Sequence, residues 1–170
     1  MIIVMYNRLP VYDIFFYKDN KMAGELIKWS DSYNLGLKEI DEQHEYLLVL
    51  MNKAWQSIIN RSDINIILGL LEELERYTIS HFIAEETFMQ AAHFPDFPEH
   101  KQEHQKFVSY IIKEKERASQ TGNISLDLMH FLRDWLVQHI LVSDKSYVDY
   151  MEKMKSKETS LLGRFFKRLI

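Results

Sequence analysis

The residues best suited to chemistry in this 170-residue chain are five histidines and two carboxylates between positions 44 and 144. Imidazole nitrogens and carboxylate oxygens, in a chain without any cysteine, suit a borderline transition metal such as iron. Burying so many of these groups without a metal would carry several desolvation costs, and no cationic residue shares their helical stripes to offset them. The sequence therefore predicts a metal centre. The candidate ligands are His44, His81, Glu85, His100, His104, His139 and Asp144.

The spacing of the candidate ligands is compatible with helices. His81 and Glu85 are four residues apart and would stack on one helical face. The two histidines at positions 100 and 104 have the same spacing and would also share a face. His139 and Asp144 are five residues apart, which puts them about 140° out of phase on a regular α-helix. They can serve one site only if the helix ends, bends or takes a π-like turn, and we predict such a distortion between residues 139 and 146.

The number of candidate ligands favours two metal ions. Two six-coordinate ions offer about twelve positions. Five imidazoles, two bridging carboxylates and a bridging oxide or hydroxide would fill about eleven, which leaves one position for a small ligand such as O₂. The Glu-x-x-His motifs of ferritin-like carboxylate bundles are absent, as is the His-Glu-x-x-His motif of zinc proteases.

Four segments carry the periodicity of amphipathic helices, with core residues at alternating steps of three and four. The five histidines occupy core positions of these stripes, and the same stripes place Phe88 and Val142 in the core. Asp144 falls outside its stripe, which again points to a local distortion. Two further histidines, His93 and His130, fall outside the stripes and are expected in loops or on the surface. The four segments are residues 37–58, 67–92, 100–111 and 128–142.

Short linkers with turn and cap residues separate these segments. Ser62 or Asp63 suits the N-cap of the second helix, Pro98 fits the first turn of the third, and Gly122 suits the end of that helix. Such short connections make consecutive helices antiparallel. The expected fold class is therefore all-α: an antiparallel up-down-up-down four-helix bundle with an N-terminal arm and a short C-terminal helix.

Composition restricts the class of protein further. The net charge of −4 argues against nucleic acid as the main partner, and no run of about 18 apolar residues predicts a transmembrane segment. The absence of cysteine excludes disulfides, iron–sulfur clusters and cysteine catalysis, and it fits a reducing compartment. We therefore expect a cytoplasmic protein, and we expect it to be a monomer.

The two ends of the chain differ from its middle. Residues 1–21 contain short apolar runs without the features of a signal peptide, and we interpret them as an N-terminal extension upstream of a natural start at Met22. Residues 22–152 would form the bundle. Residues 153–170 form a basic, amphipathic tail. A short helix that packs on the bundle is the favoured interpretation of the tail, and weak contact with a membrane surface is the alternative.

The order and spacing of the ligands resemble the hemerythrin family, specifically its single-domain bacterial members. The resemblance covers about residues 27–150 and is specific, because seven ligands stand in order at the family's spacing. It rests on Ile40-Asp41-Glu42-Gln43-His44, on His81-Phe82 with Glu85-Glu86 and Met89, on Phe94-Pro95 with His100 and His104, and on His139-Ile140 with Asp144 and Tyr147.

The resemblance implies a role for each ligand. One iron would be held by His100, His104 and His139, and the other by His44 and His81. Glu85 and Asp144 would bridge the two ions, and O₂ would bind reversibly to the iron that has fewer protein ligands. The resemblance also implies an apolar O₂ pocket, lined by Leu47, Phe82, Trp135 and Ile140.

Three functions remain open at this point. The first is reversible O₂ binding, for storage or for delivery to O₂-requiring enzymes. The second is sensing of O₂, nitric oxide or iron, which would need a separate output partner because no output domain fits in the remaining residues. The third is oxidase, peroxidase or nitric-oxide chemistry. A catalyst generally needs positioned proton donors, and the stripe around the site offers only apolar neighbours, so we expect a binding protein rather than an enzyme.

Overall fold

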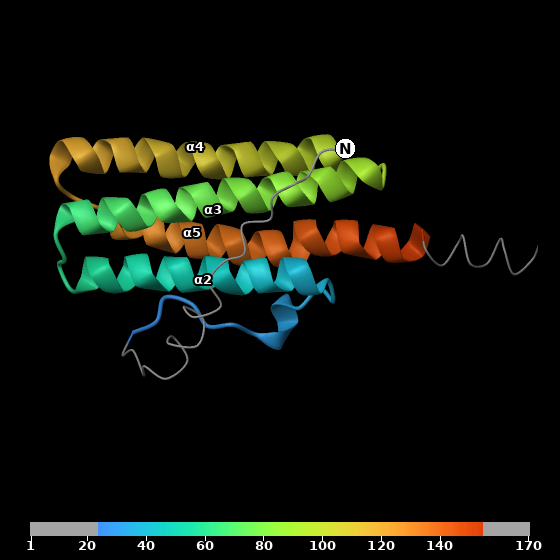
Figure 1. Cartoon of the computed structure of the whole chain (residues 1–170), viewed down its shortest axis with the longest axis horizontal. Coiled ribbons are helices and arrows are strands. Elements are labelled where there is room, and N and C mark those ends of the chain that lie inside the picture. Colours follow the sequence, from blue (N-terminus) through green and yellow to red (C-terminus); the bar gives the residue numbers. More distant parts are fainter. Residues whose placement is uncertain (1–23, 155–170) are drawn as a thin grey trace, which may run out of the picture.

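The computed structural model describes residues 24–154, and these form a four-helix bundle with an arm along one side (Figure 1). Neighbouring contacts run from α2 to α3, from α3 to α4, from α4 to α5 and from α5 back to α2. This confirms the predicted antiparallel up-down-up-down order. The helices are α2 (Lys38–Ile59), α3 (Ile64–Ala91), α4 (Phe97–Thr121) and α5 (Leu126–Gln138), and α5 continues into the π-helical segment η2 (His139–Asp144).

Local sequence sets where the helices begin and end. The Asp63 side chain accepts a hydrogen bond from the Asn65 N–H and caps α3, and Ser125 caps α5 in the same way. Pro98 lies in the first turn of α4, where its missing N–H does no harm. Gly122 ends α4 with φ of +68°, a left-handed conformation that glycine adopts without strain. The predicted linker roles of Asp63, Pro98 and Gly122 are confirmed.

The predicted distortion after His139 is also confirmed. Residues 139–144 form a π-helical turn, and α-helix resumes over residues 145–154. A π turn holds one more residue than an α turn, so residues five apart come onto the same face. Asp144 is fully buried as a result, while Val142 is 53% exposed. The prediction that Val142 belongs to the core is therefore wrong, because the stripe assumed one constant helical phase.

The arm preceding α2 is fixed by a buried amide. The Asn52 side chain accepts hydrogen bonds from the backbone N–H groups of Leu26 and Ile27 and donates one to the Ile27 carbonyl. A short 3-10 helix, η1 (Asp31–Tyr33), follows in the arm. Partly buried aromatic residues of the arm, Trp29 and Tyr33, pack on the main core. The arm thus covers one side of the bundle that carries the ligands.

The two terminal segments predicted from the sequence lie largely outside the described residues. The proposed extension, residues 1–21, is not among the described residues, and of the basic tail only residues 153 and 154 are. The domain boundaries at 21 and 152 therefore stay predictions. None of the helices between residues 24 and 154 combines the length and the apolar composition needed to cross a lipid bilayer.

Candidate metal centre

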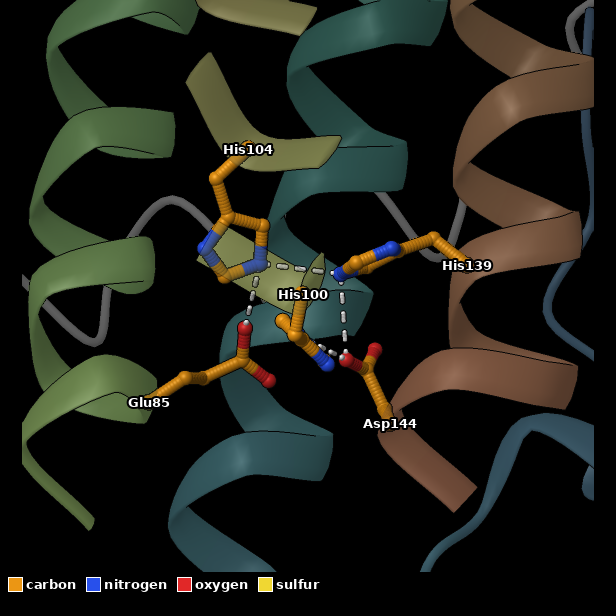
Figure 2. Close-up of side chains that lie close together, drawn as sticks. All are labelled: Glu85, His100, His104, His139 and Asp144. Atoms are coloured by element: carbon orange, nitrogen blue, oxygen red, sulfur yellow. Dashed lines mark hydrogen bonds and ion pairs between the residues drawn. The ribbon is translucent and has the colours of Figure 1, made fainter. Parts of the chain in front are cut away.

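All seven predicted ligands converge in the interior of the bundle. Each of them is at most 4% exposed, and they come from α2, α3, α4 and the π-helical segment. Their ligand atoms form two groups that share Glu85. Figure 2 shows the larger group, in which the side chains point toward a common centre. The larger group is Glu85, His100, His104, His139 and Asp144, and the smaller is His44, His81 and Glu85.

Each carboxylate faces histidines of both groups. One oxygen of Asp144 lies 3.4 Å from His44 Nε2, and the other lies 3.1 Å from His139 Nε2 and 3.3 Å from His100 Nε2. The Glu85 oxygens likewise lie 3.9 Å from His44 Nε2 and 3.4 Å from His104 Nε2. A carboxylate that places its oxygens between two sets of nitrogens has the arrangement of a bridge between two cations.

The hydrogen bonding of the site is incomplete without cations. The buried Nε2 atoms of His44, His81 and His100 and all four oxygens of Glu85 and Asp144 have no hydrogen-bond partner among the described residues. Buried polar atoms rarely remain unpaired, and each one carries a cost of roughly 1–3 kcal/mol. This set of nitrogen and oxygen donors therefore fits metal ions, which would satisfy the orphaned atoms together.

Three histidines are oriented by hydrogen bonds on their outer nitrogens. His81 Nδ1 lies 2.8 Å from the Gln43 amide oxygen, His104 Nδ1 lies 3.2 Å from Glu86, and His139 Nδ1 lies 3.0 Å from Glu103. Since these oxygens are acceptors, each Nδ1–H donates, and each Nε2 is turned toward the centre. Three outer residues thereby fix the histidines in the tautomer that binds metal.

The approach of two inward-facing ring nitrogens supports the same conclusion. His104 Nε2 and His139 Nε2 lie 2.9 Å apart. Burial alone would lower the pKa of His139, but the Asp144 and Glu103 carboxylates raise it to about 10, so this imidazole carries a proton when no metal is bound. The contact between the two nitrogens is repulsive unless a cation or a proton lies between or beside them. Two nitrogens bound to one metal at about 2.1 Å and at a right angle would be about 3.0 Å apart, so the observed separation suits neighbouring ligands.

The electrostatics of the donor set also favour cations. Burial, together with the nearby Asp144, raises the pKa of Glu85 well above its usual value. Burial alone would also raise the pKa of Asp144, but the imidazoles around it, His139 foremost, lower it well below the usual value. Burial and the neighbouring His44 lower the pKa of His81, which keeps this imidazole neutral. Two adjacent buried carboxylates oppose each other's ionisation, and bound cations remove that conflict.

The four predicted pocket residues lie beside the ligands. Leu47, Phe82 and Ile140 are buried in the main core, and Trp135 packs against it half-buried. Phe82 stacks on His104 with ring centroids 3.7 Å apart, and Trp135 stacks on His139 at 4.3 Å. Phe82 and Trp135 thus place aromatic surface directly against two of the candidate ligands. Their role in binding O₂ stays a prediction.

One polar group interrupts this apolar surround. Tyr147 is completely buried, its ring lies 6.1 Å from that of His100, and its hydroxyl has no hydrogen-bond partner among the described residues. Burial, with Glu85 and Asp144 nearby, raises the pKa of this phenol, so it stays protonated. The expectation that only apolar residues neighbour the site is therefore wrong at this position.

Sequence reasoning assigned no role to the three outer partners. Gln43, Glu86 and Glu103 each directly adjoin a predicted ligand in the sequence, and Gln43 and Glu86 also belong to the segments that carry the family resemblance. Their hydrogen bonds go to histidines of other helices, 18 to 38 positions away, so helical periodicity does not reveal them. The two remaining histidines behave as expected: His93 lies in a turn and His130 is exposed on the surface.

Comparisons with known proteins point to the same kind of site. Residues 35–151 match the model of the hemerythrin HHE cation binding domain. The chain is 29% identical to a bacteriohemerythrin of Stenotrophomonas maltophilia over 151 residues, which are 84% of this chain and 97% of the relative. It is 32% identical to a bacteriohemerythrin of Pseudomonas aeruginosa, over 82% of this chain and 95% of the relative. A crystal structure of wild-type hemerythrin superposes with a TM-score of 0.68 at 30% identity, covering 73% of this chain and 96% of that chain.

Proposed function

This chain belongs to the hemerythrin family, and we propose that it binds O₂ reversibly at a non-haem di-iron centre, for storage or for delivery to O₂-requiring enzymes. The observation that carries this proposal is the position of Glu85 and Asp144, each of which faces both histidine groups. In the proposed arrangement His100, His104 and His139 hold one iron, and His44 and His81 hold the other. The two carboxylates would bridge the ions, together with an oxide or hydroxide.

The metal ions and the protein residues would have different functions in O₂ binding. Two ferrous ions, when bound, supply the two electrons that O₂ accepts on binding and returns on release. The protein residues hold the donor set in place: the outer hydrogen bonds keep each Nε2 lone pair turned inward. Leu47, Phe82, Trp135 and Ile140 exclude water and anions from the open position. Such exclusion would favour binding over turnover, because water or an anion that reached the open position would compete with O₂ there.

An enzyme is the second candidate, and Tyr147 is the observation that favours it. Its ring lies 6.1 Å from that of His100, and its buried, protonated hydroxyl is the kind of proton donor that oxidase or peroxidase chemistry uses. We favour the binding protein, because the other pocket side chains named above are apolar. Sensing of O₂, nitric oxide or iron through a separate output partner is the third candidate. A cytoplasmic location and a monomeric state stay predictions from the sequence.

We expect the Leu47→Ala variant to keep its irons but to autoxidise faster than the wild type, so that its oxygenated form decays irreversibly in a shorter time. Leu47 is 2% exposed and lies one turn after His44, so its removal opens a cavity beside the proposed open position. The loss of stability should be about 2–5 kcal/mol. The measurement is the decay of the oxygenated protein's absorbance over time, in air, for variant and wild type.

Leu71→Ala is the matched control for this experiment. Leu71 is equally buried, but it lies ten residues, or about 15 Å of helix, from His81. It should lose similar stability without faster decay. Equal decay rates in Leu47→Ala and wild type would show that Leu47 does not protect the site.

A further inference from the structure

The three hydrogen-bonded histidines of the site do not have equivalent partners. His104 and His139, both in the proposed three-histidine position, donate to the carboxylates of Glu86 and Glu103. In the two-histidine position, His81 donates to the neutral amide of Gln43, and His44 Nδ1 has no partner among the described residues. Anionic support is therefore concentrated on one side of the centre.

The charge of the acceptor changes what the histidine offers to a metal. A carboxylate that accepts the Nδ1–H bond draws the proton toward itself and makes Nε2 a stronger electron donor. A more basic ligand binds a cation more tightly and stabilises its higher oxidation state. A neutral amide fixes the same ring orientation without adding negative charge.

We propose that Glu86 and Glu103 act as positioning residues that make the two metal positions unequal. Through them, the three-histidine position binds the first ion and binds it more tightly, and its iron is the more easily oxidised of the two. The inference rests on the ligand assignment of the proposed function. It goes beyond that function because it assigns an order of metal loading and a difference in reduction potential.

Glu103 should contribute more than Glu86. Ser143 Oγ donates to Glu103 at 2.7 Å, so the π-helical segment that supplies His139 and Asp144 also fixes this carboxylate. Glu86, in contrast, also pairs with Lys101 at 2.6 Å, and this ammonium offsets part of its charge.

Two reciprocal substitutions test the proposal. Glu103→Gln removes the charge but keeps an oxygen that accepts from His139, so the orientation of the ring survives. Gln43→Glu adds a charge behind His81 in the other position. Glu99→Gln is the control, since Glu99 is exposed on the same helix and the charge change is identical.

Metal binding is the first readout and does not depend on O₂. Protein freed of iron by a chelator is titrated with Co²⁺, whose visible absorbance reports each position. We expect Glu103→Gln to weaken the first, tighter binding step about 10-fold or more. Gln43→Glu should raise the affinity of the second Co²⁺-binding step, so that the affinities of the two steps become more similar. Glu99→Gln should match the wild type.

Reduction potential is the second readout, measured by redox titration of the iron-loaded proteins. Glu103→Gln should shift one of the two steps to a more positive potential, and a tenfold change in that equilibrium corresponds to about 59 mV. Gln43→Glu should shift the other step to a more negative potential. If Glu103 had a purely structural role, Glu103→Gln would instead have the Co²⁺ affinity and the reduction potentials of the wild type.

The outcomes separate this inference from the proposed function. If Glu103→Gln and Glu99→Gln both match the wild type in Co²⁺ affinity and in potential, the inference is wrong even if the protein binds O₂. If the variants shift as expected and the protein binds no O₂, the inference holds and the proposed function falls. Single-step binding of two equivalent ions by the wild type would also overturn the inference.

Discussion

Replacing Asp144 by alanine is expected to lower the iron content from two ions per chain to at most one, and to abolish O₂ binding. Asp144 is fully buried and places its oxygens between His44 on one side and His100 and His139 on the other. Removing it takes one ligand from each proposed iron. The measurement is elemental analysis of protein purified after iron-replete expression, with circular dichroism to verify folding.

Asp134→Ala is the matched control for this substitution. Asp134 precedes the π-helical turn on α5 and its side chain is 67% exposed, so the same chemical change there should leave two irons in place. Asp144→Asn adds a second comparison, because it keeps one neutral oxygen and nearly the same volume. Two irons in a folded Asp144→Ala protein would show that this residue is not a bridging ligand. One zinc ion in the wild type would contradict the di-iron assignment as a whole.

Removal of the metal should produce the second large effect, a loss of thermal stability. Without cations, the four buried oxygens of Glu85 and Asp144 and several imidazole nitrogens remain unpaired. An ion present at a thousandfold its dissociation constant adds about 4 kcal/mol to the free energy of unfolding. For a domain of this size that corresponds to roughly 8–16 °C in the melting temperature.

The comparison is a thermal melt of the ferrous protein under anaerobic conditions, with and without a strong chelator. Asp144→Ala, measured in the same two conditions, should show a much smaller difference, because it retains less metal. If the chelated and the iron-loaded wild type melt at the same temperature, the ions do not stabilise the folded protein and the donor set does not bind them.

The candidate metal ligands could be found from the sequence because most of them follow the helical periodicity. Each of the five candidate histidines falls on a core stripe. The five-residue step from His139 to Asp144 predicted that the helix ends, bends or takes a π-like turn, and the structure contains a π-helical turn there. The end of α3 was harder to predict. Phe88 and Met89 lie three and four residues after Glu85, and both spacings suit a core position. The structure buries Met89 completely and leaves Phe88 44% exposed.

The outer layer of the site could not be predicted because its contacts cross between helices. Whether Glu103 reaches His139 depends on the distance between α4 and the π-helical segment and on the phase after the π turn, neither of which a local pattern encodes. Tyr147 belongs to the same class: it follows the π turn, and only the shifted phase turns its hydroxyl toward the buried interior.

The most direct test of the account is an O₂ titration of the purified, fully reduced protein, followed by optical absorbance. We expect a new visible band that saturates as O₂ is added, that disappears when the sample is purged with argon, and that returns over repeated cycles. Steady consumption of O₂ in the presence of a reductant, without a stable oxygenated form, would contradict reversible binding and identify the protein as an oxidase.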